Sequence, residues 1–190
     1  QPDGKIVITG VASVIIQNQP GQSDFGLARF NADGTPDSSF GSNGKATASF
    51  NPDDSAYALA LENDGKIIVV GDTTSGVFGR FLVARFNANG SPAGTLTTGL
   101  GAFSDGATDV VAQSDGKIVV GGFASDGIQP QFALARFNAG GGFDTSFDGD
   151  GRVFTTVGAG FSNVEGLALQ ADGKIVAVGR AVSSVNGSFE

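Results

Sequence analysis

Carboxylates supply most of the side chains in this 190-residue chain that could do chemistry. The sequence contains no His, Cys, Met or Trp. The absence of His and Cys excludes Ser-His-Asp and Cys-His triads, Cys/His zinc sites, haem or iron–sulfur ligation and disulfides. What remains is the chemistry of carboxylates, which bind hard cations and cleave glycosidic bonds when they occur in suitable pairs.

One short run has the start of a calcium-loop pattern. In Asp148-Gly149-Asp150-Gly151, acids alternate with glycines, and calcium requires several convergent oxygens on a sharply bent backbone. The run lacks a third acid and a closing Glu, and Gly41-Ser42-Asn43-Gly44 occupies the corresponding place earlier in the chain. The alignment therefore favours a plain connection between strands with incidental acids. Calcium at Asp148 and Asp150 is the one cofactor that the sequence suggests.

A second group of acids falls in segments that we expect to be loops: Asp53, Asp54, Asp72, Asp105 and Asp126. They predict an acidic rim, which is either merely solvated or a surface that binds a carbohydrate or a cation-assisted ligand. A catalytic pair is poorly supported, because the only glutamates are Glu62, Glu165 and Glu190 and most aspartates lie in turns. Tyr57, the single Tyr, is expected to pack on an inner strand. We therefore assign no catalytic residue.

Three arginines share one setting, each between Ala and Phe: Arg29, Arg85 and Arg136. A guanidinium among apolar neighbours is costly unless it has partners. Asp37 and Asp144 stand eight residues after Arg29 and Arg136, so we predict two structural ion pairs within the sheet. Arg85 has Ala93 at that place and needs a carbonyl, a water or another acid.

These residues recur because the chain is repetitive. Asp-Gly-Lys-Ile occurs four times, with intervals of 61, 51 and 57 residues between the lysines. Ala-Arg-Phe-Asn follows about 20 residues after each of the first three copies, beginning at Ala28, Ala84 and Ala135. Two markers that move together define an internal repeat.

Each repeat predicts four short strands. An apolar strand such as 58–61 leads through the Asp-Gly-Lys turn to a second apolar strand such as 67–70; a variable polar connection then leads to the strand that carries Ala-Arg-Phe. A second tight turn precedes a weaker fourth strand, predicted at 45–50 and 152–156. In the second repeat this strand is doubtful, because Ala93-Gly94-Thr95-Leu96 replaces Asp-x-Ser-Phe.

Four antiparallel strands per 51–61 residues predict an all-β fold made of β-propeller blades. An open β-solenoid or a sandwich of hairpins is the alternative. The variable connections lie on one side of such blades and are the expected seat of binding: 11–24, 72–79, 123–131, 51–55, 99–106 and 157–163.

The blade boundaries predict an incomplete ring in one repeat domain, 1–190. Residues 1–55 form a partial blade with the last three strands, 56–106 and 107–162 form full blades, and 163–190 supply the first two strands of another. Propellers typically have four to eight blades, and the chain does not begin with Met. We therefore expect a fragment or processed product, in which further blades or other copies of the chain cover the open edges.

The recurring motifs resemble a known family. Gln1-Pro2-Asp3-Gly4-Lys5-Ile6-Val7, 27–34 and Asp37-Ser38-Ser39-Phe40-Gly41, repeated at 132–138 and 144–147, are similar to the bacterial delta-60 tandem repeats, which are β-propeller repeats of unknown function. The resemblance implies a large bacterial protein that is extracellular or exposed at the cell surface, with many tandem copies. It implies no enzymatic activity.

Charge and hydropathy narrow the expected partners. The formal net charge of −8 disfavours nucleic acid, and no apolar stretch is long enough for a membrane span. We expect a non-enzymatic binding or scaffold module for adhesion, display or assembly, with a protein or glycan ligand. The alternatives are a glycosidase or lyase that uses loop carboxylates, and a structural subunit that forms fibres.

Overall fold

The structure is a computed structural model that describes residues 1–14, 22–75, 78–101 and 103–182. In these residues the chain forms thirteen β-strands and no helix. None of the described segments is therefore a helix that could cross a membrane.

The strands form four antiparallel sheets, each following the chain order, which we call blades 1 to 4. Blade 1 comprises β1 (Ile6–Val14), β2 (Gln22–Phe30) and β3 (Lys45–Ala48). Blade 2 comprises β4 (Asp54–Leu61), β5 (Ile67–Ser75), β6 (Phe78–Phe86) and β7 (Pro92–Thr98). Blade 3 comprises β8 (Asp105–Ala112), β9 (Ile118–Ser125), β10 (Pro130–Phe137) and β11 (Arg152–Thr155). Blade 4 comprises β12 (Ser162–Leu169) and β13 (Ile175–Ala181).

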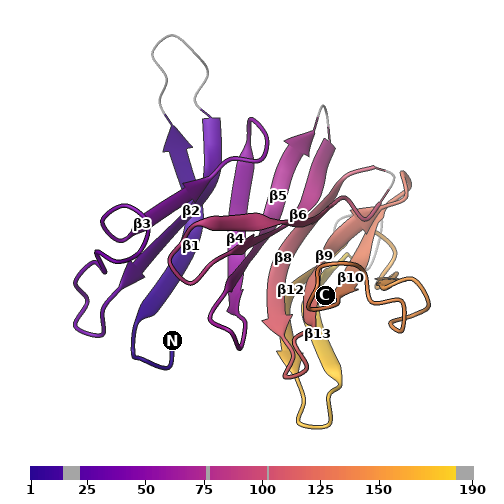
Figure 1. Cartoon of the computed structure of the whole chain (residues 1–190). Coiled ribbons are helices and arrows are strands. Elements are labelled where there is room, and N and C mark those ends of the chain that lie inside the picture. The colour runs from indigo at the N-terminus through magenta and orange to yellow at the C-terminus, as the bar shows by residue number, and fades with distance from the viewer. Residues whose placement is uncertain (15–21, 76–77, 102, 183–190) are drawn as a thin grey trace.

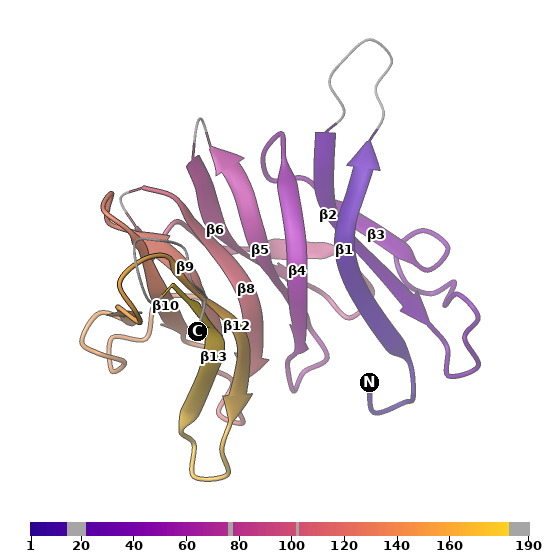
Figure 2. The same cartoon turned by 180° about the vertical axis from the view of Figure 1, so that it is seen from behind.

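The blades stand side by side and fan out along an arc (Figure 1), as the view from behind also shows (Figure 2). Strand β4 contacts β1 on one side and β8 on the other, and β8 contacts β12. The described residues form no closed ring. The prediction of four-stranded antiparallel propeller blades in an incomplete ring is confirmed.

The core lies between successive blades, and the sheet of blade 2 buries both of its faces. Blades 1 and 2 enclose a cluster that includes Phe25, Phe40 and Phe86, and blades 2 and 3 enclose one that includes Phe81 and Phe137. The run Ile67–Val70 alternates between these two clusters and is fully buried. This explains why the second strand of a repeat is continuously apolar rather than alternating.

The Asp-Gly-Lys turns form as predicted. In each copy the Asp Oδ1 accepts a hydrogen bond from the backbone N–H of the Lys two residues later. The glycine between them has a φ of 81° to 85°, in the left-handed region that glycine adopts without steric cost. The local sequence therefore fixes these hairpins without help from the rest of the fold.

The predicted loops between the second and third strands are too long. Strands β1, β5 and β9 continue to Val14, Ser75 and Ser125, inside segments predicted as 11–24, 72–79 and 123–131. The backbone groups of these strand ends pair in register with β2, β6 and β10.

The fourth strand also differs from expectation in two ways. The doubtful strand of the second repeat does form, as β7, with two register shifts against β6. In the other two repeats the fourth strand is shorter than predicted, since β3 ends at Ala48 and β11 at Thr155.

A pair of equivalent phenylalanines tests whether packing between blades stabilises the fold. Phe40 is 0% exposed and lies against blade 2, whereas Phe147, its counterpart in blade 3, is half-buried. We expect Phe40→Ala to lower the free energy of unfolding by about 3–5 kcal/mol because it leaves a cavity. Phe147→Ala is expected to cost clearly less. Urea unfolding followed by circular dichroism measures both, and equal losses would contradict this account of the core.

Candidate functional site

An ion network built from three elements repeats in blades 1 and 3. In blade 1, Arg29 on β2 donates from Nε to Asp37 Oδ2 at 2.7 Å, and Lys5 Nζ lies 2.9 Å from the same oxygen. Asp37 Oδ1 accepts from the backbone N–H and the hydroxyl of Ser39, at 3.0 and 2.7 Å. The Arg29 guanidinium also lies over the Phe40 ring, 4.7 Å from its centroid.

Blade 3 repeats this arrangement. Arg136 Nε donates to Asp144 Oδ2 at 2.7 Å, Lys117 Nζ donates to the same oxygen at 2.8 Å, and the Ser146 hydroxyl donates to Asp144 Oδ1 at 2.7 Å. The structure thus brings together both predicted pairs. Because these buried carboxylates are fully engaged within the blade, they position strands rather than contact a ligand.

The networks keep both carboxylates ionised. The hydroxyl of Ser39, followed by the ammonium group of Lys5, holds the pKa of Asp37 well below its usual range. For Asp144 the largest cause of the lowered pKa is Lys117, followed by Ser146.

In blade 2 the equivalent arginine, Arg85, pairs with a different acid. Arg85 Nη2 donates to Glu62 Oε1 at 2.8 Å and to the carbonyl of Ala139 in blade 3 at 3.0 Å. Arg85 therefore has both an acid and a carbonyl as partners, which were among the options that the sequence left open. The role of Glu62 was missed. One feature of the sequence could have indicated it. At the position four residues before the Lys, only this repeat has an acid, whereas the others have Gln1, Gln113 and Gln170.

Two of the predicted rim acids are buried, and their placement on an exposed rim is wrong. Asp54 is 0% and Asp105 is 1% exposed. Asp54 Oδ2 accepts from the N–H groups of Phe50 and Asn51, and Asp105 Oδ2 accepts from those of Leu100 and Gly101. Asp105 Oδ1 also accepts from the N–H of Phe81 in blade 2. Each carboxylate ties the start of an inner strand to the loop before it.

Asp53 and Asp72 have different surroundings. Asp53 is exposed, and its carbonyl accepts a hydrogen bond from Thr74 N. Asp72 is half-buried near Tyr57, whose pKa is raised by burial and then by Asp72. Tyr57 is 56% exposed, so its predicted packing is wrong; it stands where β4 shifts register against β5, and such a bulge re-aims a side chain.

Asp150, one of the two acids of the calcium candidate, is paired with Arg152. Asp150 accepts from the backbone N–H of Arg152 and, through Oδ2, from Nε and Nη2 of the same residue at 3.1 and 2.8 Å. The Arg152 guanidinium thus neutralises this carboxylate. Over the described part of the chain, no three acids gather in an arrangement that could hold a metal ion.

A pocket lies between blades 2 and 3 on the side of the variable connections, and it contains the remaining predicted acid, Asp126. Its lining comes from the loop before β8, the end of β9, the turn after it, β10 and β11: Leu100, Gly101, Ala124, Ser125, Asp126, Gln131 and Phe154. Phe154 is 44% exposed, although it is a large aromatic side chain.

The loop that forms one wall of this pocket is held rigidly. Asp105 binds the N–H groups of Leu100 and Gly101, while Arg80 Nη1 donates to the carbonyls of Gly101 and Phe103 at 3.1 and 2.8 Å. Arg80 Nη1 also lies 3.6 Å from Asp105 Oδ2. Asp105 is therefore a positioning residue for the pocket rather than a ligand-binding group.

Asp126 is fixed at the opposite wall. Its Oδ1 accepts from the backbone N–H groups of Ile128 and Gln129, at 2.9 and 3.3 Å, and these bonds lower its pKa. Its Oδ2 accepts from Gln131 Nε2 at 3.4 Å. The pocket thus combines an exposed aromatic ring, an ionised carboxylate and an amide over an apolar floor of Leu100 and Ala124, which is a composition suited to binding.

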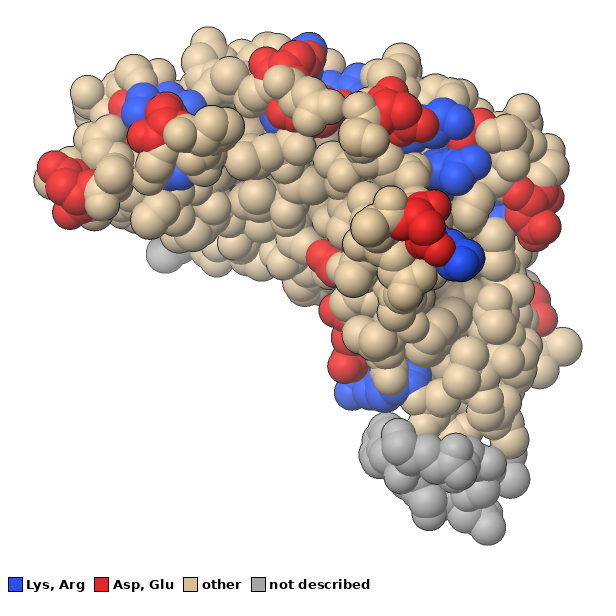
Figure 3. Space-filling model, turned by 90° about the horizontal axis from the view of Figure 1, so that it is seen from below, with Lys and Arg blue, Asp and Glu red and all other residues tan. Residues whose placement is uncertain are grey.

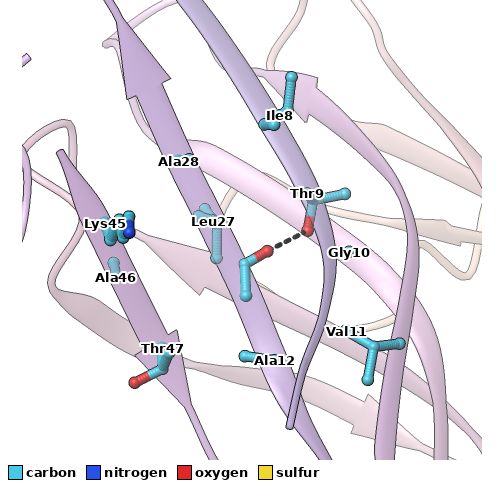
Figure 4. A pocket seen from close by; sticks show the side chains of 11 residues that line it. Ile8, Thr9, Gly10, Val11, Ala12, Leu27, Ala28, Lys45, Ala46 and Thr47 are labelled. Carbon is cyan, nitrogen blue, oxygen red and sulfur yellow. Dashed lines mark hydrogen bonds between the residues drawn. The ribbon is translucent and has the colours of Figure 1, made fainter. Parts of the chain in front are cut away.

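A second depression lies on the sheet of blade 1 (Figure 4). It is lined by small and aliphatic residues such as Ile8, Val11 and Ala46, and the Thr9 hydroxyl already donates to the carbonyl of Gly26 at 3.0 Å. Seen from the end that carries the tight turns, acidic and basic groups lie beside one another (Figure 3).

The comparisons with known proteins agree with the repeats. The family model described as "Domain of unknown function (DUF5122) beta-propeller" matches residues 1–40, 62–92, 113–147 and 170–190. Each of the four matched segments contains one Asp-Gly-Lys turn. No curated protein matches the chain.

The pairing of Arg85 with Glu62 predicts that loss of the Glu62 carboxylate lowers the free energy of unfolding more than loss of the Glu165 carboxylate. Both side chains are largely buried, so Glu62→Gln should lower the free energy of unfolding by about 1–3 kcal/mol. The matched control is Glu165→Gln, because Glu165 pairs with Arg180 at 3.0 Å on the exposed surface and should cost less than about 0.5 kcal/mol. Chemical denaturation at pH 7 measures both. A Glu62→Gln variant as stable as the control would show that Arg85 does not need its acid.

The ion networks also predict loss of stability in acid. The pKa values of Asp37 and Asp144 are lowered in the folded chain, so their contribution is present above the unfolded-state pKa of about 3.9 and is lost as the pH falls below it. The urea midpoint should therefore fall between about pH 4.5 and pH 2.5. A variant with Asp37→Asn and Asp144→Asn should be less stable at pH 7 and lose less stability across this range. An unchanged pH slope in the variant would contradict the assignment.

Proposed function

Since the chain belongs to the DUF5122 beta-propeller family, we propose that it is a non-enzymatic binding module whose rigid blades present a glycan pocket between blades 2 and 3. The proposal takes the repeats to be delta-60 repeats. It places the module outside a bacterial cell or at the cell surface, where it acts in adhesion or display. The similarity of the motifs to delta-60 repeats supports the location, and the pocket supports the binding role.

The observation that carries the proposal is the exposed Phe154 ring beside a fixed carboxylate and amide. The C–H face of a sugar ring packs on an aromatic side chain, while carboxylate and amide groups bind its hydroxyls and set its orientation. Asp126 Oδ2 makes a single long hydrogen bond, to Gln131, and so retains capacity to accept hydrogen bonds from a ligand.

The same residues argue against hydrolysis. Cleavage of a glycosidic bond normally uses two carboxyl groups, one of which is protonated. Among the described residues that line the pocket, Asp126 is the single carboxylate, and its lowered pKa keeps it ionised. Binding without turnover is therefore the better-supported function of this site.

A glycan array followed by calorimetry on the best-bound oligosaccharide tests the proposal. Phe154→Ala and Asp126→Asn are each expected to weaken binding at least tenfold, which corresponds to about 1.4 kcal/mol. The matched control is Phe161→Ala, which removes another partly exposed ring that does not line the pocket and should leave affinity unchanged. Absence of any bound glycan, or equal affinity of all three variants, would refute the glycan pocket; release of shortened sugars on incubation would refute the non-enzymatic assignment.

A further inference from the structure

Between blades 2 and 3, a buried carboxylate lies beside a guanidinium. Asp105, the first residue of β8, is 1% exposed, and its Oδ1 accepts a hydrogen bond from the N–H of Phe81. Arg80 Nη1 lies 3.6 Å from Asp105 Oδ2 and donates to the carbonyls of Gly101 and Phe103. The negative charge buried at this junction is therefore balanced by a basic side chain.

Between blades 1 and 2, the position equivalent to the arginine carries an acid. Asp54 begins β4, as Asp105 begins β8. Asp24 stands four residues before an Ala-Arg-Phe motif, as Arg80 does. An ion pair at one junction thus corresponds to two carboxylates at the other.

The backbone brings these two carboxylates to neighbouring positions. Ser23 and Asp53 form a parallel β-bridge. Asp24 and Asp54 are the next residues of the two bridged segments. Because paired backbones lie about 4.8 Å apart, one small ion can contact a side chain from each segment.

Both acids are buried, and neither is neutralised within the described residues. Asp24 is 9% and Asp54 is 0% exposed. The Oδ1 atom of each carboxylate is buried and accepts no hydrogen bond from the described part of the chain. None of the ion pairs formed there includes either acid. Two neighbouring buried carboxylates without a counter-charge would strongly destabilise the fold.

A buried hydroxyl on β5 lies on the same face of blade 2 as Asp54. Thr73 stands directly opposite Asp54 in the pairing of β4 with β5, and side chains directly opposite each other in an antiparallel pair are neighbours on one face. Thr73 is 1% exposed, and its Oγ1 is buried without a hydrogen-bond partner among the described residues. It adds an uncharged oxygen to the two carboxylates.

We propose that Asp24 and Asp54 bind a calcium ion, which takes the part that the Arg80 guanidinium plays at the next junction. The two Oδ1 atoms supply the charged ligands, and Thr73 Oγ1 supplies a third oxygen. Backbone carbonyls of the loop before β4, residues 50–52, bind the ion as the carbonyls of Gly101 and Phe103 bind Arg80. Water completes the coordination shell.

The donors favour calcium among the common cations. All of them are hard oxygen atoms, and they come from β2, β4 and β5, so the ion must accept an irregular shell. Calcium takes six to eight oxygens in flexible geometry, whereas magnesium requires a near-ideal octahedron. With only two carboxylates we expect a Kd of about 10⁻⁴–10⁻³ M. The site lies at a different junction from the proposed glycan pocket, so the two proposals can fail separately.

Calorimetric titration of the EDTA-treated 190-residue chain with calcium chloride tests the proposal. We expect one calcium ion per chain, a higher urea midpoint with calcium than with EDTA, and new hydrogen-exchange protection of the amides of residues 22–25 and 50–54. Asp24→Asn should weaken binding by about tenfold or more. The matched control is Asp150→Asn, which removes an exposed acid in another blade and should leave the calcium affinity unchanged.

Asp24→Arg is the sharpest variant, because it places at this junction the side chain that the next junction has. It should bind no calcium and, in EDTA, should have a higher urea midpoint than the unmodified chain. The milder Asp24→Asn keeps the test valid if Asp24→Arg unfolds the chain. Asp54 is left intact, because its Oδ2 also caps the N–H groups of Phe50 and Asn51.

Three results would overturn the proposal. The first is absence of calcium binding by the unmodified chain, or binding that survives Asp24→Asn. The second is loss of binding in Asp150→Asn, which would place the ion in the run 148–151. The third is a urea midpoint that rises on acidification and does not respond to calcium, because the two carboxylates would then share a proton instead of a metal ion.

Discussion

The fold depends on burying one guanidinium at each junction between blades. An arginine in the third strand of a blade lies among apolar residues, where an unpaired charge would cost several kcal/mol. Its position is tolerated because the arginine has an acid in its own blade. Between blades 1 and 2 and between blades 2 and 3, it also donates to a carbonyl of the next blade. The same side chain thus fixes the second turn of its own blade and the distance to its neighbour. These contacts join the separate sheets of blades 1, 2 and 3 into a single array.

This constraint also explains why so few acids are left for chemistry. Asp37, Asp144 and Glu62 are engaged by arginines, and Asp54 and Asp105 cap backbone amides where inner strands begin. The carboxylates that a sequence reader would count as potential catalysts therefore hold the array together. The proposed binding function uses Asp126 in a variable connection and Phe154 on β11, which line one pocket.

Much of the architecture follows from short-range signals in the sequence. The Asp-Gly-Lys turn and the spacing of Ala-Arg-Phe-Asn predicted four-stranded blades, since a left-handed glycine and an Asx contact specify a hairpin within four residues. The strand ends at Val14, Ser75 and Ser125 were not predictable in this way, because their pairing depends on a partner strand and not on polarity. The burial of Asp105 was likewise hidden. Its main partners are the N–H groups of Phe81, Leu100 and Gly101, and backbone amides leave no trace in side-chain patterns.

Arg85 pairs with Glu62 because Ala93 stands where the other repeats have the pairing Asp, which shows how repeats can differ while the constraint stays the same. Once the acid after the third strand is lost, that turn is free to change, and β7 indeed follows β6 with two register shifts and a longer strand than β3 or β11. The longer strand leads into the loop held by Arg80 and Asp105, which forms one wall of the proposed glycan pocket. Strand β7 therefore runs from the altered turn at Ala93 to the loop whose Leu100 and Gly101 line the proposed binding pocket.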